Sequence, residues 1–177
     1  PNSGSMLGLL NEYNDAWISK SENPNRKLKF TLEIINDKKS NVGINTHRAN
    51  RIVEEALQNK KIVELKKFTS IKREVKFSKE TRFDFMLENK IKKAFVEVKN
   101  VTLSREKEIS EFPDAVTARG KKHLVHLQEA IGKGYESYLL FLIQREDIKI
   151  MKIADDIDLN YYNEIKKAKK NGVKIIA

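Results

Sequence analysis

Cysteine is absent from this chain of 177 residues, which excludes disulfides and thiolate metal sites and fits a reducing cytoplasm. No apolar run approaches the roughly 20 residues that a membrane-spanning helix needs, and no secretory signal precedes the predicted fold. Walker and dinucleotide-binding glycine patterns are also missing, as are internal repeats. We therefore expect a cytoplasmic protein with no membrane partner and no phosphate loop of these two kinds.

Positive charge is plentiful. Lys and Arg number 35 against 25 Asp and Glu, which gives a formal net charge of +10. Such an excess favours polyanionic partners, most simply nucleic acid, although a general lysine-rich bias would produce the same charge. The length predicts one domain, with room for a small appendage. Because the first residue is Pro1 rather than Met, we expect the chain to begin inside a longer protein.

Residues 82–100 have the pattern of a β-hairpin, with alternating apolar and polar residues on both sides of a polar break. Successive strand side chains point to opposite faces, so Glu97 and Lys99 share one face, and a suitable register adds Asp84 from the neighbouring strand. Two carboxylates and an amine placed together can hold a divalent metal and orient a water for phosphodiester hydrolysis. Polar groups on two solvent-facing strands are the alternative.

The remaining elements are predicted from apolar spacing and from turn residues. Helices are predicted over 46–59, 114–131 and 158–170. Strands are predicted over 16–18, 30–35, 62–77 (with a bend), 137–144, 148–153 and 173–176. The polar segment 102–112 is predicted to be a mobile loop at the mouth of the site. This order indicates an α/β (α+β) fold with a mixed central sheet flanked by helices.

The helix over 114–131 carries two rows of interest. One is an apolar core seam, made of Val116, Gly120, Leu124, Leu127 and Ile131. The other is a polar row on an adjacent face, made of Arg119, Lys122, His123 and His126. The polar row can follow a phosphate backbone or supply a proton donor, and a solvated helix face is the alternative. The two histidines have too few partners for a metal site.

The first predicted helix, over 46–59, starts at a cap supplied by Thr46 or Asn50. Glu54 and Glu55 flank opposite edges of its apolar stripe, so periodicity leaves open which of them points toward the hairpin.

Residues 1–44 have too few apolar residues to be stable alone and are expected to lean on the rest of the chain or on missing residues. They contain a polar loop with a Pro-Asn turn and nearby cations, in which Asn23, Arg26 and Lys27 are candidate phosphate contacts. A solvated loop is an equally good interpretation.

Several sequence blocks, taken together, resemble the sugar fermentation stimulation protein A family. These blocks are residues 1–8, 21–28, 42–46, 82–85, 96–102 and 112–120. The resemblance covers essentially the whole chain. It implies that residues 1–44 are the remainder of an OB-like β-barrel whose start is missing, and that residues 45–177 form a restriction-endonuclease-like domain of the PD-(D/E)xK kind. It also implies a DNA-binding protein without marked sequence preference, linked to the regulation of maltose metabolism.

The same resemblance assigns roles to individual residues. Asp84 matches the aspartate of the first motif strand, with Phe83 in place of the proline that names the motif. Glu97 and Lys99 match the Glu-x-Lys pair, and Glu55 matches the acid on the first helix. In this hypothesis Asp84 and Glu97, with the Val98 carbonyl, hold Mg²⁺ or Mn²⁺, and Lys99 orients the attacking water.

Three functions remain open at this stage. The chain is a metal-dependent nuclease that binds DNA, a non-catalytic DNA-binding transcriptional regulator that keeps a nuclease fold, or an RNA-directed nuclease. In the regulator hypothesis, affinity comes from Arg26, Lys27, Arg119 and Lys122 and depends strongly on salt. The third function is less favoured because an aromatic stacking signature is missing. The sequence does not determine the oligomeric state, and a homodimer is compatible with it.

Overall fold

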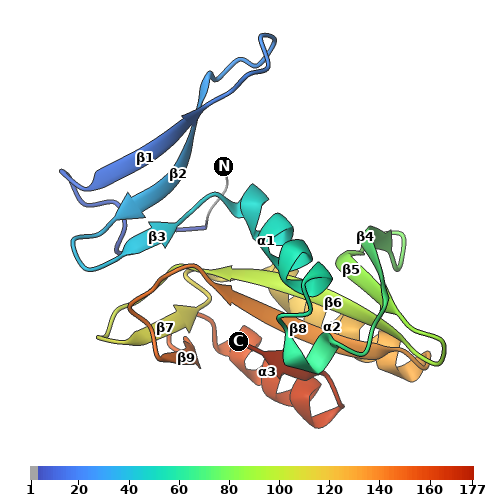
Figure 1. Ribbon diagram of the computed structural model, residues 1–177. Helices are drawn as coiled ribbons and strands as arrows, with labels where there is room; N and C mark the ends of the chain where they lie inside the picture. Colours follow the sequence, from blue (N-terminus) through green and yellow to red (C-terminus); the bar gives the residue numbers. More distant parts are fainter. Residues whose placement is uncertain (1–3) are drawn as a thin grey trace.

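The computed structural model describes residues 4–177, in which a small three-stranded sheet precedes a larger mixed α/β unit (Figure 1). Residues 1–3, which begin the first family-like block, lie outside the described part. The helices are α1 (Thr46–Gln58), α2 (Ala118–Gly132) and α3 (Leu159–Lys170). The strands are β1 (Asp15–Lys20), β2 (Phe30–Asn36), β3 (Asn41–Gly43), β4 (Ser70–Lys76), β5 (Arg82–Glu88), β6 (Lys93–Val101), β7 (Ile109–Phe112), β8 (Glu136–Ile143), β9 (Ile150–Ile153) and β10 (Lys174–Ile176).

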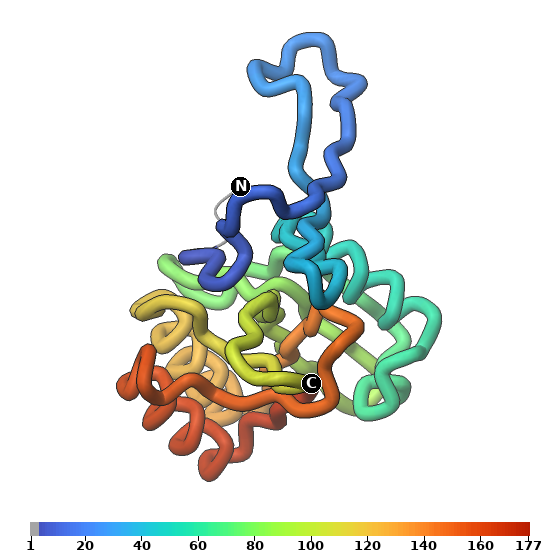
Figure 2. Tube along the Cα trace, turned by 90° about the vertical axis from the view of Figure 1, so that its left-hand side faces the viewer, coloured from blue at the N-terminus to red at the C-terminus, as the bar shows by residue number. Residues whose placement is uncertain are grey.

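Strands β1, β2 and β3 form the antiparallel N-terminal sheet. A small core made of Leu9, Ile35, Val42 and Ile44 stabilises it. The long connection between β1 and β2 projects away from the larger unit (Figures 1 and 2). Strand β3 was not predicted, because a three-residue strand is too short for a periodic pattern.

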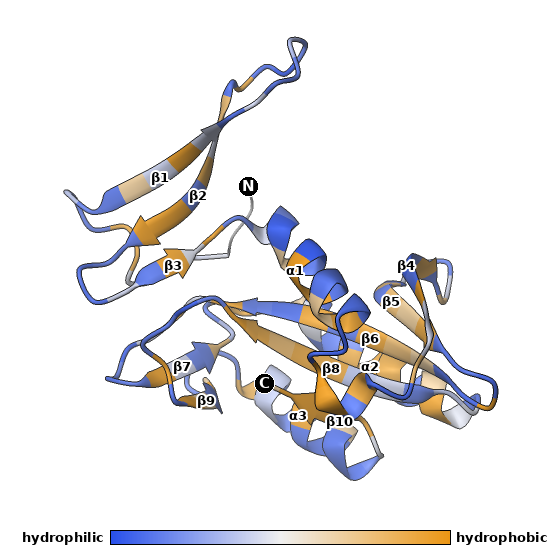
Figure 3. Ribbon diagram, viewed as in Figure 1, coloured by the Kyte–Doolittle hydropathy of each residue, from blue (hydrophilic) through white to orange (hydrophobic). Residues whose placement is uncertain are grey.

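The central sheet has five strands in the order β10-β8-β6-β5-β4. Strands β4, β5 and β6 pair antiparallel, whereas β6, β8 and β10 pair parallel. Helix α1 covers one face through Val53 and Leu57, and α2 and α3 cover the other face through residues such as Leu124 and Ile165. The mixed sheet flanked by helices is therefore confirmed. Figure 3 shows that the central strands are mainly apolar and that the outer faces of the helices are polar.

The predicted alternation along β5 is confirmed, because Phe83, Phe85 and Leu87 are buried and the residues between them are not. Phe85 and Leu87 pack in the core below α1, but Phe83 packs in the core that α2 and α3 cover. The side chains of Phe83 and Phe85, two positions apart, therefore pack in different hydrophobic cores.

Two other segments also differ from the prediction. Val63–Leu65 is a short 3₁₀ helix, so the strand expected from residue 62 onward begins only at β4. Within the segment 102–112, expected to be a mobile loop, residues Ile109–Phe112 form β7, which pairs with β9. These segments have too few alternating residues for a periodic prediction.

Helix α2 begins later than predicted, at Ala118, because the side chain of Thr117 accepts the backbone N–H of Gly120 and caps the helix. Val116 therefore lies before the helix and is 75% exposed instead of joining the core seam. Helix α1 is capped by Asn45, not by Thr46 or Asn50.

Within residues 4–177, none of the helices combines the length and the apolar content needed to cross a bilayer.

Candidate functional site

The candidate site lies where β5 and β6 separate. The two strands are paired from Glu88–Lys93 to Phe85–Val96, and the ladder ends there. One further step in the same register would place Asp84 opposite Glu97. Instead, Oδ2 of Asp84 accepts the backbone N–H of Val98 at 2.7 Å. The carboxylate thus takes the place of a backbone acceptor at the point where the strands diverge.

Asp84 is held from two sides. Its Oδ2 is bound by Val98, and its Oδ1 accepts a hydrogen bond from Asn50 of α1 at 2.8 Å. Burial and the neighbouring negative charge of Glu97 raise the pKa of Asp84 to about 6, against the opposing effects of these hydrogen bonds and of Lys99. The ionised form of Asp84 therefore lacks sufficient positive charge around it.

Glu97 is only 3% exposed, at the centre of β6. Its Oε1 accepts a hydrogen bond from Lys99 Nζ at 2.7 Å and is also in close contact with Nδ1 of His123. Its Oε2 is buried and has no hydrogen-bond partner. Burial raises the pKa of Glu97, but the charge of Lys99 and the contact with His123 outweigh burial and keep the pKa below its usual value. Glu97 is thus a buried carboxylate with one oxygen saturated and the other free.

His123 was not predicted to belong to this cluster. We expected it to lie in a cationic row on α2, but it is buried, and its Nδ1 lies against Oε1 of Glu97 and 3.3 Å from Lys99 Nζ. Its Nε2 is 3.5 Å from Nε of Arg119, which points to a tautomer protonated on Nδ1 and donating to Glu97. A sequence signal for this position did exist. His123 lies three residues after Gly120 and four before Leu127, so it belongs to the core seam as much as to the polar row.

A cavity of about 600 Å³ opens beside the two carboxylates. Its lining combines acids with cations from β4, β5 and α2 and consists of Glu74, Glu80, Arg82, Asp84, Glu97, Ala118, Arg119, Lys122 and His123. Lys122 forms an ion pair with Glu80 across this opening. Asp84 and Glu97 thus line one cavity together with Arg119 and Lys122, and Lys99 adjoins it through its hydrogen bond to Glu97.

Glu55 is not among the residues that line this cavity. It is exposed on α1, which buries Ala49, Val53 and Leu57. The α1 side chain that contacts Asp84 is Asn50. Sequence periodicity did not single out Asn50, since it needs the position of α1 relative to β5.

Asn23, Arg26 and Lys27 are all exposed in the connection between β1 and β2. This connection projects away from the central sheet (Figures 1 and 2), so the structure does not bring the three residues to the cavity. They form a separate cationic surface, which we call the β1–β2 loop (residues 21–29).

The residues beside this cavity offer oxygen donors to a divalent cation. In residues 4–177, three or more His, Asp or Glu side chains are nowhere grouped as a metal site. Asp84 and Glu97 supply two carboxylates, and Mg²⁺ and Mn²⁺ readily complete their coordination with backbone carbonyls, waters and phosphate oxygens. Two observations fit such an ion: the unpaired, buried Oε2 of Glu97 and the raised pKa of Asp84 beside a second acid. The cluster therefore fits a hard cation held by few protein ligands.

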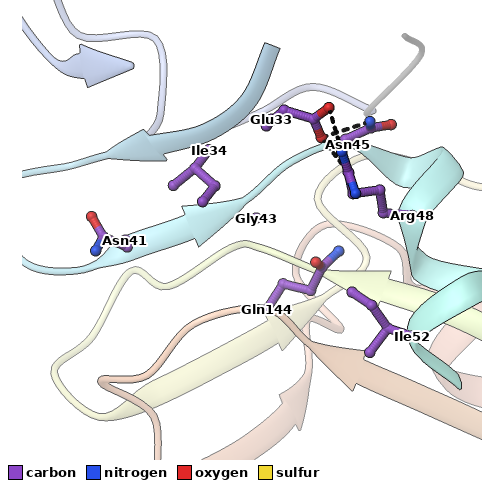
Figure 4. A pocket seen from close by; sticks show the side chains of 8 residues that line it. All are labelled: Glu33, Ile34, Asn41, Gly43, Asn45, Arg48, Ile52 and Gln144. Atoms are coloured by element: carbon purple, nitrogen blue, oxygen red, sulfur yellow. Dashed lines mark hydrogen bonds and ion pairs between the residues drawn. The ribbon is translucent and has the colours of Figure 1, made fainter. Parts of the chain in front are cut away.

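A second cavity, of about 430 Å³, lies between the N-terminal sheet and the start of α1 (Figure 4). Ile34 and Ile52 provide apolar walls, while Glu33 accepts hydrogen bonds from Arg48 at 2.6 and 3.0 Å and from Asn45 at 2.9 Å. The hydrogen bond from Arg48 is the main cause that lowers the pKa of Glu33 to about 2. Because Asn45 and Arg48 already occupy the Glu33 carboxylate, this cavity is a weaker candidate for a catalytic site.

Comparisons with known proteins agree on one family. The family model described as "Sugar fermentation stimulation protein RE domain" matches residues 47–177, and "SfsA N-terminal OB domain" matches residues 1–44. The "Sugar fermentation stimulation protein homolog" of Pelagibacter ubique is 57% identical over 177 residues, covering 100% of this chain and 76% of that protein. The homolog of Agrobacterium fabrum is 42% identical over 178 residues, covering 100% and 74%.

A solved structure shares the fold. "The structure of Pyrococcus Furiosus SfsA in complex with Ca2+" superimposes with a TM-score of 0.82 at 24% identity, covering 90% of this chain and 68% of that one. The arrangement of the sheet and helices, and the restriction-endonuclease-like fold expected from the sequence, are thus shown.

Proposed function

This chain belongs to the sugar fermentation stimulation protein family, and we propose that it binds nucleic acid, most simply DNA, and hydrolyses phosphodiester bonds with Mg²⁺ or Mn²⁺. The observation that carries this proposal is the convergence of Asp84, Glu97 and Lys99 at the separation of two strands. A buried pair of acids that shares a single lysine is costly unless further positive charge is supplied.

In this proposal Asp84 and Glu97 hold the ion, together with the Val98 carbonyl. The bound cation supplies Lewis-acid stabilisation of the phosphoryl oxygens and a water of lowered pKa. Lys99 lies on Oε1 of Glu97, from which its ammonium group orients the attacking water. His123 holds the same oxygen from α2 and fixes the plane of the Glu97 carboxylate.

Binding in the proposed function comes mainly from phosphate contacts. Arg119 and Lys122 line the cavity next to the carboxylates, where they can neutralise phosphates on either side of the scissile bond. The β1–β2 loop adds a second cationic surface, and the whole chain carries a formal charge of +10. Contacts of this kind carry no base information, so they support binding without marked sequence preference.

The relative from Pyrococcus furiosus adds support for a cation. That protein was solved in complex with Ca²⁺, a hard ion that prefers oxygen ligands. The carboxylate pair of the present chain has the same ligand chemistry.

The test is incubation of labelled single- and double-stranded DNA and RNA with Mg²⁺, Mn²⁺ or EDTA. We expect products that require metal in the wild-type protein and are lost in Lys99→Ala. Lys169→Ala, which removes an exposed lysine on α3, is the matched control and should cleave normally. Products that are independent of metal, or equally abundant in Lys99→Ala, would refute the enzymatic proposal.

One observation favours a second function, a non-catalytic DNA-binding regulator of the kind linked to maltose metabolism. The described residues lack a third acidic or histidine ligand at the carboxylate pair. In that case the incubations would yield no products, while DNA binding would persist in EDTA and weaken steeply with salt. Competition between matched RNA and DNA oligonucleotides identifies the preferred nucleic acid in either case.

A further inference from the structure

Among residues 4–177, only two buried side-chain polar atoms have no hydrogen-bond partner: Oε2 of Glu97 and Oη of Tyr161. Tyr161 is 0% exposed on α3 and contributes its ring to the core between α2, α3 and the sheet. Buried polar groups in folded proteins are nearly always paired, with protein or with ordered water. Two exceptions in one small domain therefore need a physical account.

The two atoms belong to one region. The Tyr161 ring passes α2 at Gly120, where a Cβ would lie 3.1 Å from Cε2 of the ring. Gly120 is one helical turn before His123, whose ring contacts Glu97. The Tyr161 ring and the ring of His123 therefore lie against neighbouring turns of α2, and His123 contacts Glu97. The electrostatics agree, because burial and then the negative charges of Glu97 and Asp158 raise the pKa of Tyr161.

Asp158, the other acid near the phenol, is already occupied. Its Oδ1 accepts the backbone N–H of Tyr161 at 2.9 Å, and its Oδ2 accepts the backbone N–H of Thr117 at 2.8 Å. Asp158 caps α3 and is therefore needed where it is. This leaves a hydroxyl that needs an acceptor and a Glu97 oxygen that needs a donor, with no direct hydrogen bond between them. One water molecule can accept from the first and donate to the second.

We propose that Tyr161 is a positioning residue for Glu97 and acts through one water molecule bound between Tyr161 Oη and Glu97 Oε2. A carboxylate oxygen has lone pairs for both a hydrogen bond and a cation, so the water does not displace the ion. With His123 and Lys99 on Oε1, the bound water fixes the carboxylate at its other end. The consequence for metal affinity rests on the proposed function. The water-mediated contact between Tyr161 and Glu97 does not rest on the proposed function.

The first arm of the test needs no metal. A high-resolution crystal structure of the wild-type protein grown in EDTA should show one ordered water within hydrogen-bond distance of both atoms. The same density should be missing in Tyr161→Phe, which keeps the ring and removes only the hydroxyl. An absence of water in the wild-type protein, or a water that persists unchanged in Tyr161→Phe, would overturn the proposal. This result stands even if the protein neither binds metal nor cleaves nucleic acid.

The second arm is isothermal titration with Mn²⁺, which measures binding rather than turnover. Loss of an outer hydrogen bond to a metal ligand typically weakens affinity 10–100-fold, so we expect the dissociation constant of Tyr161→Phe to rise about tenfold. Tyr162→Phe is the matched control, because Tyr162 is the next residue on α3 and its ring lies beneath Lys166 instead. Thermal unfolding of both variants checks that the fold is intact. A folded Tyr161→Phe that binds Mn²⁺ with wild-type affinity would contradict the positioning role. If the wild-type protein itself fails to bind Mn²⁺, the metal in the proposed function is refuted. The crystal structure in EDTA then still decides whether a water links Tyr161 to Glu97.

Discussion

The carboxylate cluster where β5 and β6 separate and the β1–β2 loop differ in how far their charged side chains are exposed to solvent. In the cluster, Glu97 is buried, Asp84 and Lys99 are half-buried, and each contacts fixed partners. In the loop, Arg26 and Lys27 are exposed to solvent. Buried charges are poorly screened by salt and depend on the positions of single atoms, whereas exposed charges act mainly by their number. The comparison separates a site suited to chemistry from a surface suited to binding.

The largest expected effect separates the two regions directly. Glu97→Gln should lower the single-turnover cleavage rate by about 10²–10³-fold, the size seen when one preorganised electrostatic group is removed. DNA affinity in EDTA should stay the same or increase, because a negative charge near the phosphates is lost. Cleavage assays and fluorescence anisotropy measure the two quantities. Glu129→Gln removes an exposed acid on α2 and is the control, and a parallel loss of binding and cleavage in Glu97→Gln would break the distinction.

A second effect concerns stability without metal. The pKa of Asp84 is about 6 in the folded protein against 3.8 for the ordinary carboxyl, so the folded state binds the proton more tightly. The free energy of unfolding should therefore fall as pH rises through this window, by about 3 kcal/mol in total. Urea unfolding in EDTA, from about pH 4 to about pH 7, measures this slope. Asp84→Asn should lose most of it, and an unchanged slope would show that Asp84 is not the buried acid responsible.

Substitutions in the β1–β2 loop should weaken DNA binding and leave cleavage unchanged. A double variant with Arg26→Ala and Lys27→Ala should bind DNA about tenfold more weakly at low salt, with a logarithmic salt slope that is smaller by about two. The cleavage rate of fully bound substrate should not change. Lys169→Ala combined with Lys170→Ala removes the same charge from α3 and serves as the control. If both double variants weaken binding equally, net charge and not the loop determines affinity.

The smallest effect is expected at Glu55. The family resemblance assigned an acid role to this residue, but its side chain is exposed and does not line the cavity. Glu55→Gln should therefore keep cleavage and Mn²⁺ affinity within about twofold of wild type, as is usual for an exposed substitution away from a site. A large loss of cleavage would mean that α1 moves toward the hairpin when substrate binds.

Much of this arrangement could be predicted from local patterns. The hydrophobic stripe and its polar flanks predicted α1 within a residue at each end, and the order of elements predicted the mixed sheet. The alternation in β6 placed Glu97 and Lys99 on one face, as observed. These features depend on neighbours a few residues away, which is the range that periodicity reports.

The remaining features depend on contacts between distant segments. Phe83 joins the core that α2 and α3 cover, whereas Phe85 and Leu87 join the core below α1. His123 is buried because α2 packs its seam against the sheet, which the polar neighbours on its own helix concealed. The choice of Asn50 over Glu55 as the α1 contact depends on how that helix crosses the hairpin. Tertiary packing decides each of these, and the one local signal, the spacing of His123 from Gly120 and Leu127, fits the polar row equally well.

The central claim is that one divalent ion binds between two carboxylates from adjacent strands. Anomalous diffraction from crystals soaked in Mn²⁺ tests it most directly. The account predicts a single strong peak about 2.1 Å from an oxygen of Asp84 and an oxygen of Glu97, with Lys99 still bound to Glu97. A peak at any other place, or none while both carboxylates keep only their protein donors, would contradict it.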